Sequence, residues 1–343
     1  MNKSASIKEN INDERINKLN FWLRSMSDFE DADIEQVSGD ASFRRYFRVR
    51  KDSLSFIAMD SPPEKENCGS FLKVANFLDH MSVNVPRIIE SNIEEGFLLL
   101  SDLGSQDYLD VLIQSPESAK NLYEDAIKSL HKIQHHGKTF QTELPPYDEK
   151  LLKEELSIFY EWLCSRHIGL KFGNDDMKKW LQCCDELISN ALKQPKVFVH
   201  RDFHSRNLMK TKKNNPGIVD FQDAVEGPIT YDIVSLLRDC YISWPETKVQ
   251  EWCEDYYFSL DHSIKKIMNF KKFIYYFDLM GVHRHLKAAG IFFRLHYRDG
   301  KSGYIKDVPR TINYIYKVTL KYPELSFLRV LIKERCMPAL RKV

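Results

Sequence analysis

Two carboxylates and one amide stand at the ends of short apolar runs in the second half of the chain. The segment Val197-Phe-Val-His200-Arg-Asp202 is followed by Asn207, and a second apolar run, Gly217-Ile-Val, leads into Asp220. An aspartate such as Asp202 can accept the proton of an attacking hydroxyl group. Asn207 and Asp220 offer the hard oxygen ligands that Mg²⁺ prefers. This arrangement of strand, polar loop, strand and second acid predicts a phosphoryl-transfer site.

The spacing of the first three polar residues admits other interpretations as well. His200, Asp202 and Asn207 follow the H-x-D-x-x-x-x-N layout of a kinase catalytic loop. The same residues could form a hairpin loop whose polarity serves solubility, or His200 and His204 could bind zinc, although no Cys partner lies nearby. The apolar flanks and the later Val-Asp-Phe favour the catalytic interpretation. Within it, His200 is expected to be structural, packing and hydrogen-bonding beneath the loop.

Composition narrows the class of protein. The 343 residues are too many for one simple core and suit two lobes. A formal net charge of +1 gives no global field that would attract nucleic acid or an acidic membrane. The seven Cys residues are scattered without metal-ligand spacing, which indicates reduced thiols in the cytoplasm. The polar N-terminus has no secretory core, and no apolar run approaches membrane-spanning length.

Apolar periodicity divides the chain into a β-rich part and a helical part. Residues 11–29 and 71–80 have helical spacing, and strands are expected at 43–49, 55–59, 85–90 and 96–100. After Leu103-Gly104 the pattern favours helices, at 119–135, 151–167, 175–193, 231–240, 248–259, 270–289 and 309–321. The sequence therefore predicts an α+β, bilobal protein-kinase-like fold. Residues 1–102 would be a small nucleotide-binding lobe, and residues 103–343 a larger catalytic and substrate-binding lobe.

Two N-terminal segments are candidates for binding a nucleotide. The first is a turn of small residues whose backbone N–H groups could approach phosphate, or which could be only a hairpin turn: Gly39, Asp40, Ala41, Ser42 and Phe43. The second is the connector between the lobes, with Leu100, Asp102 and Leu103.

The strand that should carry a phosphate-binding Lys, 56–60, has none. Arg44, Arg45 or Arg48 on the preceding strand could replace it, since guanidinium binds phosphate bidentately. Alternation places Arg45, our candidate nucleotide ligand, on the opposite face from Arg44 and Arg48. The alternative is that all three face solvent. Glu64 or Glu66 could pair with such an arginine.

Taken together, these motifs resemble those of the aminoglycoside phosphotransferase and choline kinase-like superfamily over nearly the whole chain. His200 to Asn207 resembles its catalytic loop, Asp220 its metal-binding acid and Leu98 to Gly104 its hinge. Several longer motifs resemble the bacterial anomeric sugar kinases, namely 39–48, 59–64, 220–228, 231–239 and 298–301. Those enzymes phosphorylate N-acetylmuramate and N-acetylglucosamine at C1 in peptidoglycan recycling. The resemblance implies ATP and Mg²⁺ as cofactors and an amino sugar as substrate.

Substrate contacts are expected from the catalytic loop and from a basic segment, 281–298, that lacks acidic residues before its final Arg298. His204 and Arg206 either touch substrate or phosphate or shape the loop, and Asp223 either contacts a sugar hydroxyl or is an ordinary loop acid. His283, Arg284 and Lys287 would form a basic wall that suits an anionic or neutral sugar, or a solvated basic face. An aminoglycoside or choline-like substrate and a nucleotide-binding pseudokinase remain alternatives. We expect a monomer without nucleic-acid or membrane partners.

Overall fold

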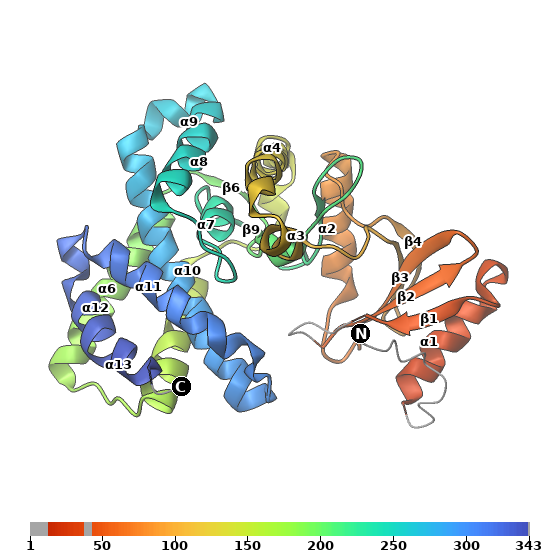
Figure 1. Ribbon diagram of the computed structural model, residues 1–343, viewed down its shortest axis with the longest axis horizontal. Helices are drawn as coiled ribbons and strands as arrows, with labels where there is room; N and C mark the ends of the chain where they lie inside the picture. Colours follow the sequence, from red (N-terminus) through yellow and green to blue (C-terminus); the bar gives the residue numbers. More distant parts are fainter. Residues whose placement is uncertain (1–12, 38–42, 342–343) are drawn as a thin grey trace. The chain divides into compact units, whose positions relative to one another are not determined.

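The structure is a computed structural model that describes residues 13–37 and 43–341 (Figure 1). The chain forms two compact units. The smaller unit contains the chain up to Gln106 together with Met209–Asp223, and the larger unit contains Asp107–Leu208 and Ala224–Val343. The chain therefore leaves the smaller unit, returns to it once and leaves it again.

The smaller unit is built on a five-stranded antiparallel sheet with the strand order β1-β2-β3-β5-β4. Its strands are β1 (Asp33–Gln36), β2 (Arg45–Lys51), β3 (Leu54–Asp60), β4 (Ile88–Asn92) and β5 (Phe97–Ser101). A two-residue turn at Asp52-Ser53 joins β2 to β3 in an antiparallel hairpin, with Asp52 at a φ of 51°, so the strands expected at 43–49 and 55–59 are confirmed. Strand β1 was not predicted, because its sequence Asp-Ile-Glu-Gln has too few apolar residues to show an alternating pattern.

In its described residues the smaller unit contains the helices α1 (Glu14–Ser25) and α2 (Cys68–His80). Helix α1 buries Ile16, Leu19 and Leu23 in one apolar cluster with Phe47 and other residues of the sheet. Asp13 caps α1 by accepting the N–H groups of residues 15 and 16. Burial of apolar side chains at helical spacing explains why this segment folds as a helix on the sheet.

The returning segment is fixed to the smaller unit by specific contacts. The N–H of Ile218 donates to the carbonyl of Asn84 at 2.8 Å, and the ring of Phe221 lies 4.8 Å from that of Phe71 on α2. Two short strands, β7 (Leu208–Met209) and β8 (Gly217–Ile218), pair within this part of the chain. Asp220 is thus carried by residues that pack on α2.

The larger unit is mainly helical. Its helices are α3 (Tyr108–Gln114), α4 (Ala119–His136), α5 (Glu149–Ile158), α6 (Asn174–Leu192), α7 (Tyr231–Leu237), α8 (Glu246–Ser259), α9 (His262–Ile267), α10 (Phe270–Asp299), α11 (Val308–Thr319), α12 (Ser326–Leu331) and α13 (Met337–Leu340). A π-helical continuation, η5 (Phe159–His167), follows α5. The strands β6 (Lys196–Val199) and β9 (Val225–Pro228) form an antiparallel pair.

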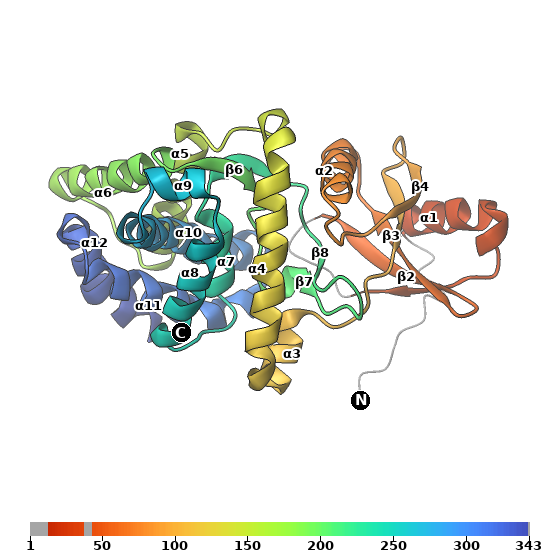
Figure 2. The ribbon, with the colours of Figure 1, turned by 90° about the horizontal axis from the view of Figure 1, so that it is seen from above.

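Helix α10 is the central element of this unit (Figure 2). It runs for 30 residues from a side-chain cap at Asn269 to Gly300, whose φ of 68° ends it in a left-handed turn. Seventeen of its residues, including His283 and Arg284, are buried against α5, α6, α7, α11 and other neighbours. A helix that is buried on most sides can carry polar groups only where they find partners or line a cavity.

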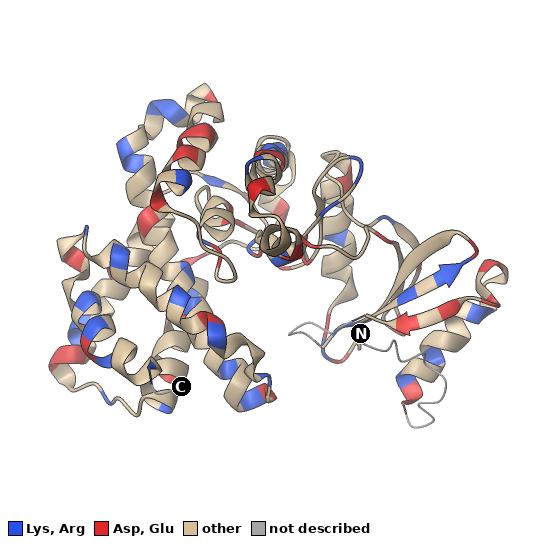
Figure 3. Ribbon diagram, viewed as in Figure 1, with Lys and Arg blue, Asp and Glu red and all other residues tan. Residues whose placement is uncertain are grey.

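The predicted α+β bilobal fold is confirmed: a β-rich unit is followed by a helical one. Lys, Arg, Asp and Glu occur on both units, in keeping with the low net charge (Figure 3). All seven cysteines are buried and free. Among the described residues, no helix is both long and apolar enough to cross a membrane.

Candidate active site

The catalytic loop begins where β6 ends. Val197, Phe198 and Val199 are buried, so the strand anchors the loop in the core of the larger unit. The carboxylate of Asp232, at the start of α7, accepts the N–H groups of His200 at 2.7 Å and Arg201 at 3.0 Å. These bonds hold Arg201 at a φ of 75°, a left-handed conformation that a side chain of this size rarely adopts. Asp232 therefore supports the catalytic loop.

Further hydrogen bonds fix the backbone around Asp202. Its N–H donates to Nδ1 of His200 at 3.2 Å, and its carbonyl accepts Nδ2 of Asn207 at 2.9 Å. His200 is fully buried, which confirms its structural role beneath the loop. The carboxylate of Asp239 accepts both the N–H and the Oγ–H of Ser205, at 2.9 and 2.5 Å. The loop is therefore preorganised by groups that do not themselves need to touch a substrate.

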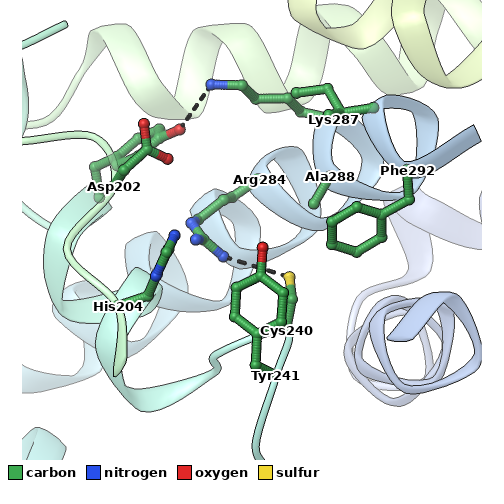
Figure 4. Close-up of a pocket in the computed structure, with 10 residues that line it drawn as sticks. Asp202, His204, Cys240, Tyr241, Arg284, Lys287, Ala288 and Phe292 are labelled. Carbon is green, nitrogen blue, oxygen red and sulfur yellow. Dashed lines mark hydrogen bonds between the residues drawn. The ribbon is translucent and has the colours of Figure 1, made fainter. Parts of the chain in front are cut away.

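The side chain of Asp202 lines a pocket of about 100 Å³ in the larger unit (Figure 4). The other lining residues come from the catalytic loop, from α7 and the segment after it, and from one face of α10: His204, Tyr231, Cys240, Tyr241, Arg284, Lys287, Ala288, Ile291 and Phe292. Arg284, Lys287, Ala288 and Ile291 follow helical spacing, so a single face of α10 forms one wall. The structure thus brings together four predicted site residues, Asp202, His204, Arg284 and Lys287.

The charge state of Asp202 is set by its surroundings. Burial alone would raise the pKa of its carboxyl, but the positive charge of Lys287, the largest opposing cause, lowers it. Asp202 is therefore ionised at neutral pH and able to accept a hydrogen bond from a hydroxyl group. Burial lowers the pKa of His204, so its imidazole is neutral at pH 7. Among the described residues its Nδ1 has no hydrogen-bond partner.

Glu155 on α5 is a buried acid, paired with a pocket-lining lysine, that sequence reasoning missed. Its buried carboxylate pairs with Nζ of Lys287 at 2.7 Å and with a guanidinium nitrogen of Arg201 at 2.5 Å, and it accepts the hydroxyl of Tyr147. Burial would raise the pKa of Glu155, but Lys287 and then Arg201 lower it to about 2. The segment 281–298 contains no acid before Asp299, yet an acid from another helix neutralises part of it. No local pattern in the sequence marks Glu155, which lies in an ordinary run of Glu and Lys.

Three predicted substrate residues are not among the residues lining this pocket. His283 is fully buried, its Nε2 lies 3.3 Å from the carbonyl oxygen of Leu152, and burial lowers its pKa to about 4, so it is a neutral packing residue. The guanidinium of Arg206 stacks over the rings of Tyr241 and Tyr304, which favours a role in shaping the loop. Asp223 is exposed and belongs to the smaller unit.

The arginines of the smaller unit differ in their partners. Arg44 is buried, pairs with Glu66 at 2.6 Å and places Nη1 3.9 Å from Oδ1 of Asp220. The expectation that Glu66 pairs with one of these arginines is confirmed. Arg45 instead bonds Asp13 and the fully buried Asp60.

The connector residues are also held by local contacts. Arg48 bonds the carboxylate of Asp102 at 2.7 Å, and Oγ of Ser55 donates to the same group at 2.5 Å. Leu100 is buried in the sheet, and the Leu103 side chain packs close to Gly217.

In the predicted nucleotide-binding turn, the N–H of Phe43 donates to Glu66 at 3.3 Å. Gly39, Asp40, Ala41 and Ser42 lie outside the described residues.

The predicted metal ligands provide the donor types that Mg²⁺ requires. The Nδ2 group of Asn207 is committed to the carbonyl of Asp202, which orients the amide oxygen in the opposite direction. Asp220 has a φ of 62°, and its Oδ1 accepts Nε2 of Gln222 at 2.9 Å. In the described part of the chain no three His, Cys, Asp or Glu side chains form a metal site.

Comparison with known proteins assigns this fold to a class. The ethanolamine kinase of Plasmodium vivax has a similar structure, with a TM-score of 0.64 at 12% sequence identity, covering 91% of each chain. The fold is therefore that of the kinase-like phosphotransferases. Residues 33–262 match the phosphotransferase enzyme family, and the chain belongs to that family.

Two curated relatives are much more similar in sequence. A Pseudomonas putida protein is 44% identical over 323 residues, covering 94% of this chain and 94% of its own length. A Pseudomonas aeruginosa protein is 42% identical over 334 residues, covering 93% of this chain and 96% of its own length. Both are named N-acetylmuramate/N-acetylglucosamine kinase.

Proposed function

We propose that the protein is an ATP- and Mg²⁺-dependent kinase that phosphorylates the anomeric C1 hydroxyl of N-acetylmuramate and N-acetylglucosamine. The observation that carries the proposal is the identity of 42–44% over more than nine tenths of the chain to two kinases named for these sugars. The pocket that contains Asp202 supports it, because the aspartate lies beside apolar and cationic groups suited to an acetylated sugar. The reaction would return free amino sugars to metabolism during peptidoglycan recycling.

Asp202 is the proposed catalytic residue. Its ionised carboxylate would accept a hydrogen bond from the C1 hydroxyl and orient the oxygen for attack on the terminal phosphorus of ATP. The new bond joins the sugar oxygen to phosphorus, the bond between phosphorus and the bridging oxygen breaks, and ADP leaves. The hydroxyl proton passes to Asp202 and then to solvent. Because its pKa is lowered, Asp202 is a weak base, and its main contribution is orientation.

Nucleotide binding is proposed for residues 1–102, and catalysis and substrate binding for residues 103–343. Asn207 and Asp220 would hold Mg²⁺, which when bound neutralises charge on the phosphates. Arg44 is the best candidate to replace the absent strand lysine, because Glu66 fixes its guanidinium and Asp220 lies nearby. Arg45 is already bonded to two carboxylates and is the weaker candidate.

A substrate panel tests the proposal. Purified protein with Mg-ATP is expected to release ADP with N-acetylmuramate and N-acetylglucosamine but not with an aminoglycoside or choline. The product should be the 1-phosphate, identified by ³¹P NMR. Asp202→Asn should retain ATP binding and lose about 10²- to 10⁴-fold in kcat. Binding of Mg-ATP without phosphorylation of any sugar or amine would favour a nucleotide-binding module instead.

A further inference from the structure

The cations around the pocket differ in whether a carboxylate neutralises them. Lys287 pairs with Glu155 at 2.7 Å and lies 3.3 Å from the hydroxyl of Tyr231. Arg284 is only 6% exposed, and among the described residues no carboxylate oxygen lies within 4.0 Å of its side-chain nitrogens. Its hydrogen-bond acceptor is the thiol of Cys240, at 3.6 Å, which is a weak acceptor (Figure 4).

A buried guanidinium without an anion is unusual in a folded protein. Removing a charge from water is unfavourable unless an opposite charge and hydrogen bonds replace the lost solvation. Asp202 and Asp239 lie close enough to influence Arg284 but beyond ion-pair distance. The thiol of Cys240 satisfies one of the five N–H donors at most. The guanidinium therefore has unused capacity for a planar, bidentate anion such as a carboxylate.

Arg284 lies on the face of α10 that also carries apolar residues of the pocket. Ala288, Ile291 and Phe292 follow it along the same face and line the same pocket, so an apolar surface adjoins the guanidinium. Figure 4 shows the guanidinium of Arg284 next to His204 and Cys240 and apart from the amine of Lys287. An acetylated sugar with a carboxylate arm presents the complementary combination of apolar and anionic groups.

We propose that Arg284 is the specificity-determining residue that binds the lactyl carboxylate of N-acetylmuramate. This inference rests on the proposed function. N-acetylglucosamine has a hydroxyl in place of the lactyl ether, so it would bind without using this contact. The assignment separates Arg284 from Lys287 and His283, whose partners lie within the protein.

Steady-state kinetics with both sugars test the assignment. Arg284→Met should lower kcat/KM for N-acetylmuramate about 10- to 100-fold, mainly through KM, because a charge-assisted bidentate contact is lost. The same variant should change kcat/KM for N-acetylglucosamine less than about 3-fold. Arg284→Lys keeps the positive charge but loses the planar guanidinium that binds a carboxylate bidentately. Its kcat/KM for N-acetylmuramate should therefore lie between those of wild type and Arg284→Met. Arg335→Met, the same change at an exposed position outside α10 and the pocket, is the matched control and should leave both sugars unaffected.

Activity toward N-acetylglucosamine also shows whether Arg284→Met has damaged the fold. An equal loss for both sugars would overturn the assignment, because it would place Arg284 at the transferred phosphate or in the fold. Removal of an unpaired buried cation should leave the melting temperature of the sugar-free protein unchanged or raise it. If wild type phosphorylates neither sugar, the proposed function fails. Calorimetric titration with N-acetylmuramate then decides the inference, which requires binding to wild type and at least about 10-fold weaker binding to Arg284→Met.

Discussion

Replacing Glu155 by Gln removes one negative charge that two buried cations share. Glu155→Gln keeps the size of the side chain and part of its hydrogen bonding. It removes the carboxylate that pairs with Arg201 on the catalytic loop at 2.5 Å and with Lys287 on α10 at 2.7 Å. We expect lower stability and a lower kcat, because both elements lose their common anchor.

The structure allows two independent estimates of the size of the effect. Breaking a buried ion pair by removing one partner costs about 3–5 kcal/mol. The pKa of Glu155, lowered from 4.5 to about 2, corresponds to about 3 kcal/mol of preference for the charged form in the folded state. In a unit of this size, about 3 kcal/mol lowers Tm by about 10 °C.

The pH dependence of this contribution has a definite sign. Because the folded-state pKa of Glu155 is lowered, the stabilisation is fully present above about pH 4.5 and is lost as the pH falls toward 2. The difference in unfolding free energy between wild type and Glu155→Gln should therefore be largest at neutral pH and narrow below pH 4.5.

Urea unfolding and thermal scans of both proteins measure this difference. Glu149→Gln is the matched control, because Glu149 lies on the same helix and pairs with Lys153 at an exposed site. It should change the unfolding free energy by less than about 1 kcal/mol. A Glu155→Gln protein no less stable than Glu149→Gln would refute the reasoning. So would a stability difference that does not narrow in acid.

Three other predictions follow from the remaining contacts. Asp220→Ala and Asn207→Ala should each raise the Mg²⁺ concentration for half-maximal activity about 10-fold or more, measured by magnesium titration, whereas an unchanged requirement would exclude them as ligands. Arg44→Met should raise the KM for ATP about 10-fold with partial recovery in Arg44→Lys, and no change would remove Arg44 as the replacement for the lysine. Burial raises the pKa of Asp232 to about 7, so its stabilisation of the fold is complete below pH 4 and declines as the pH rises through 7. The Tm of Asp232→Asn should therefore improve relative to wild type between pH 5 and pH 8, and a constant difference would contradict this.

Much of the fold and the catalytic loop could be predicted from local sequence. Strands β2, β3 and β5 have clear apolar patterns, and the hydrogen bonds of His200 and Asn207 to the backbone of Asp202 join neighbours within one motif. The bonds from the loop to Asp232 are instead long-range contacts. The helix 270–289 was predicted too short, because its second half mixes aromatic and basic residues and ends only at Gly300. Local pattern alone cannot show that α10 is buried on most sides.

The sequence pattern could not predict which side chains line the pocket, because this depends on tertiary contacts between distant parts of the chain. Sequence grouped His283, Arg284 and Lys287 as equivalent basic residues. The fold gives them different partners, the Leu152 carbonyl, the Cys240 thiol and the Glu155 carboxylate. Glu155 lies far from them in the chain, so a segment that lacks acids before Asp299 does not create an acid-free surface. The same is true of Arg45, whose buried partner Asp60 became evident only from the paired strands.

The return of Met209–Asp223 to the smaller unit limits how this protein can be divided or recombined. A fragment that ends at Gln106 would lack the backbone partner of Asn84 and the aromatic partner of Phe71. Exchange of the N-terminal half between two homologues would combine one parent's α2 with the other parent's Asp220 segment. Functional chimeras are therefore expected only when both stretches come from the same parent, so that the two distant parts of the gene are inherited as one unit.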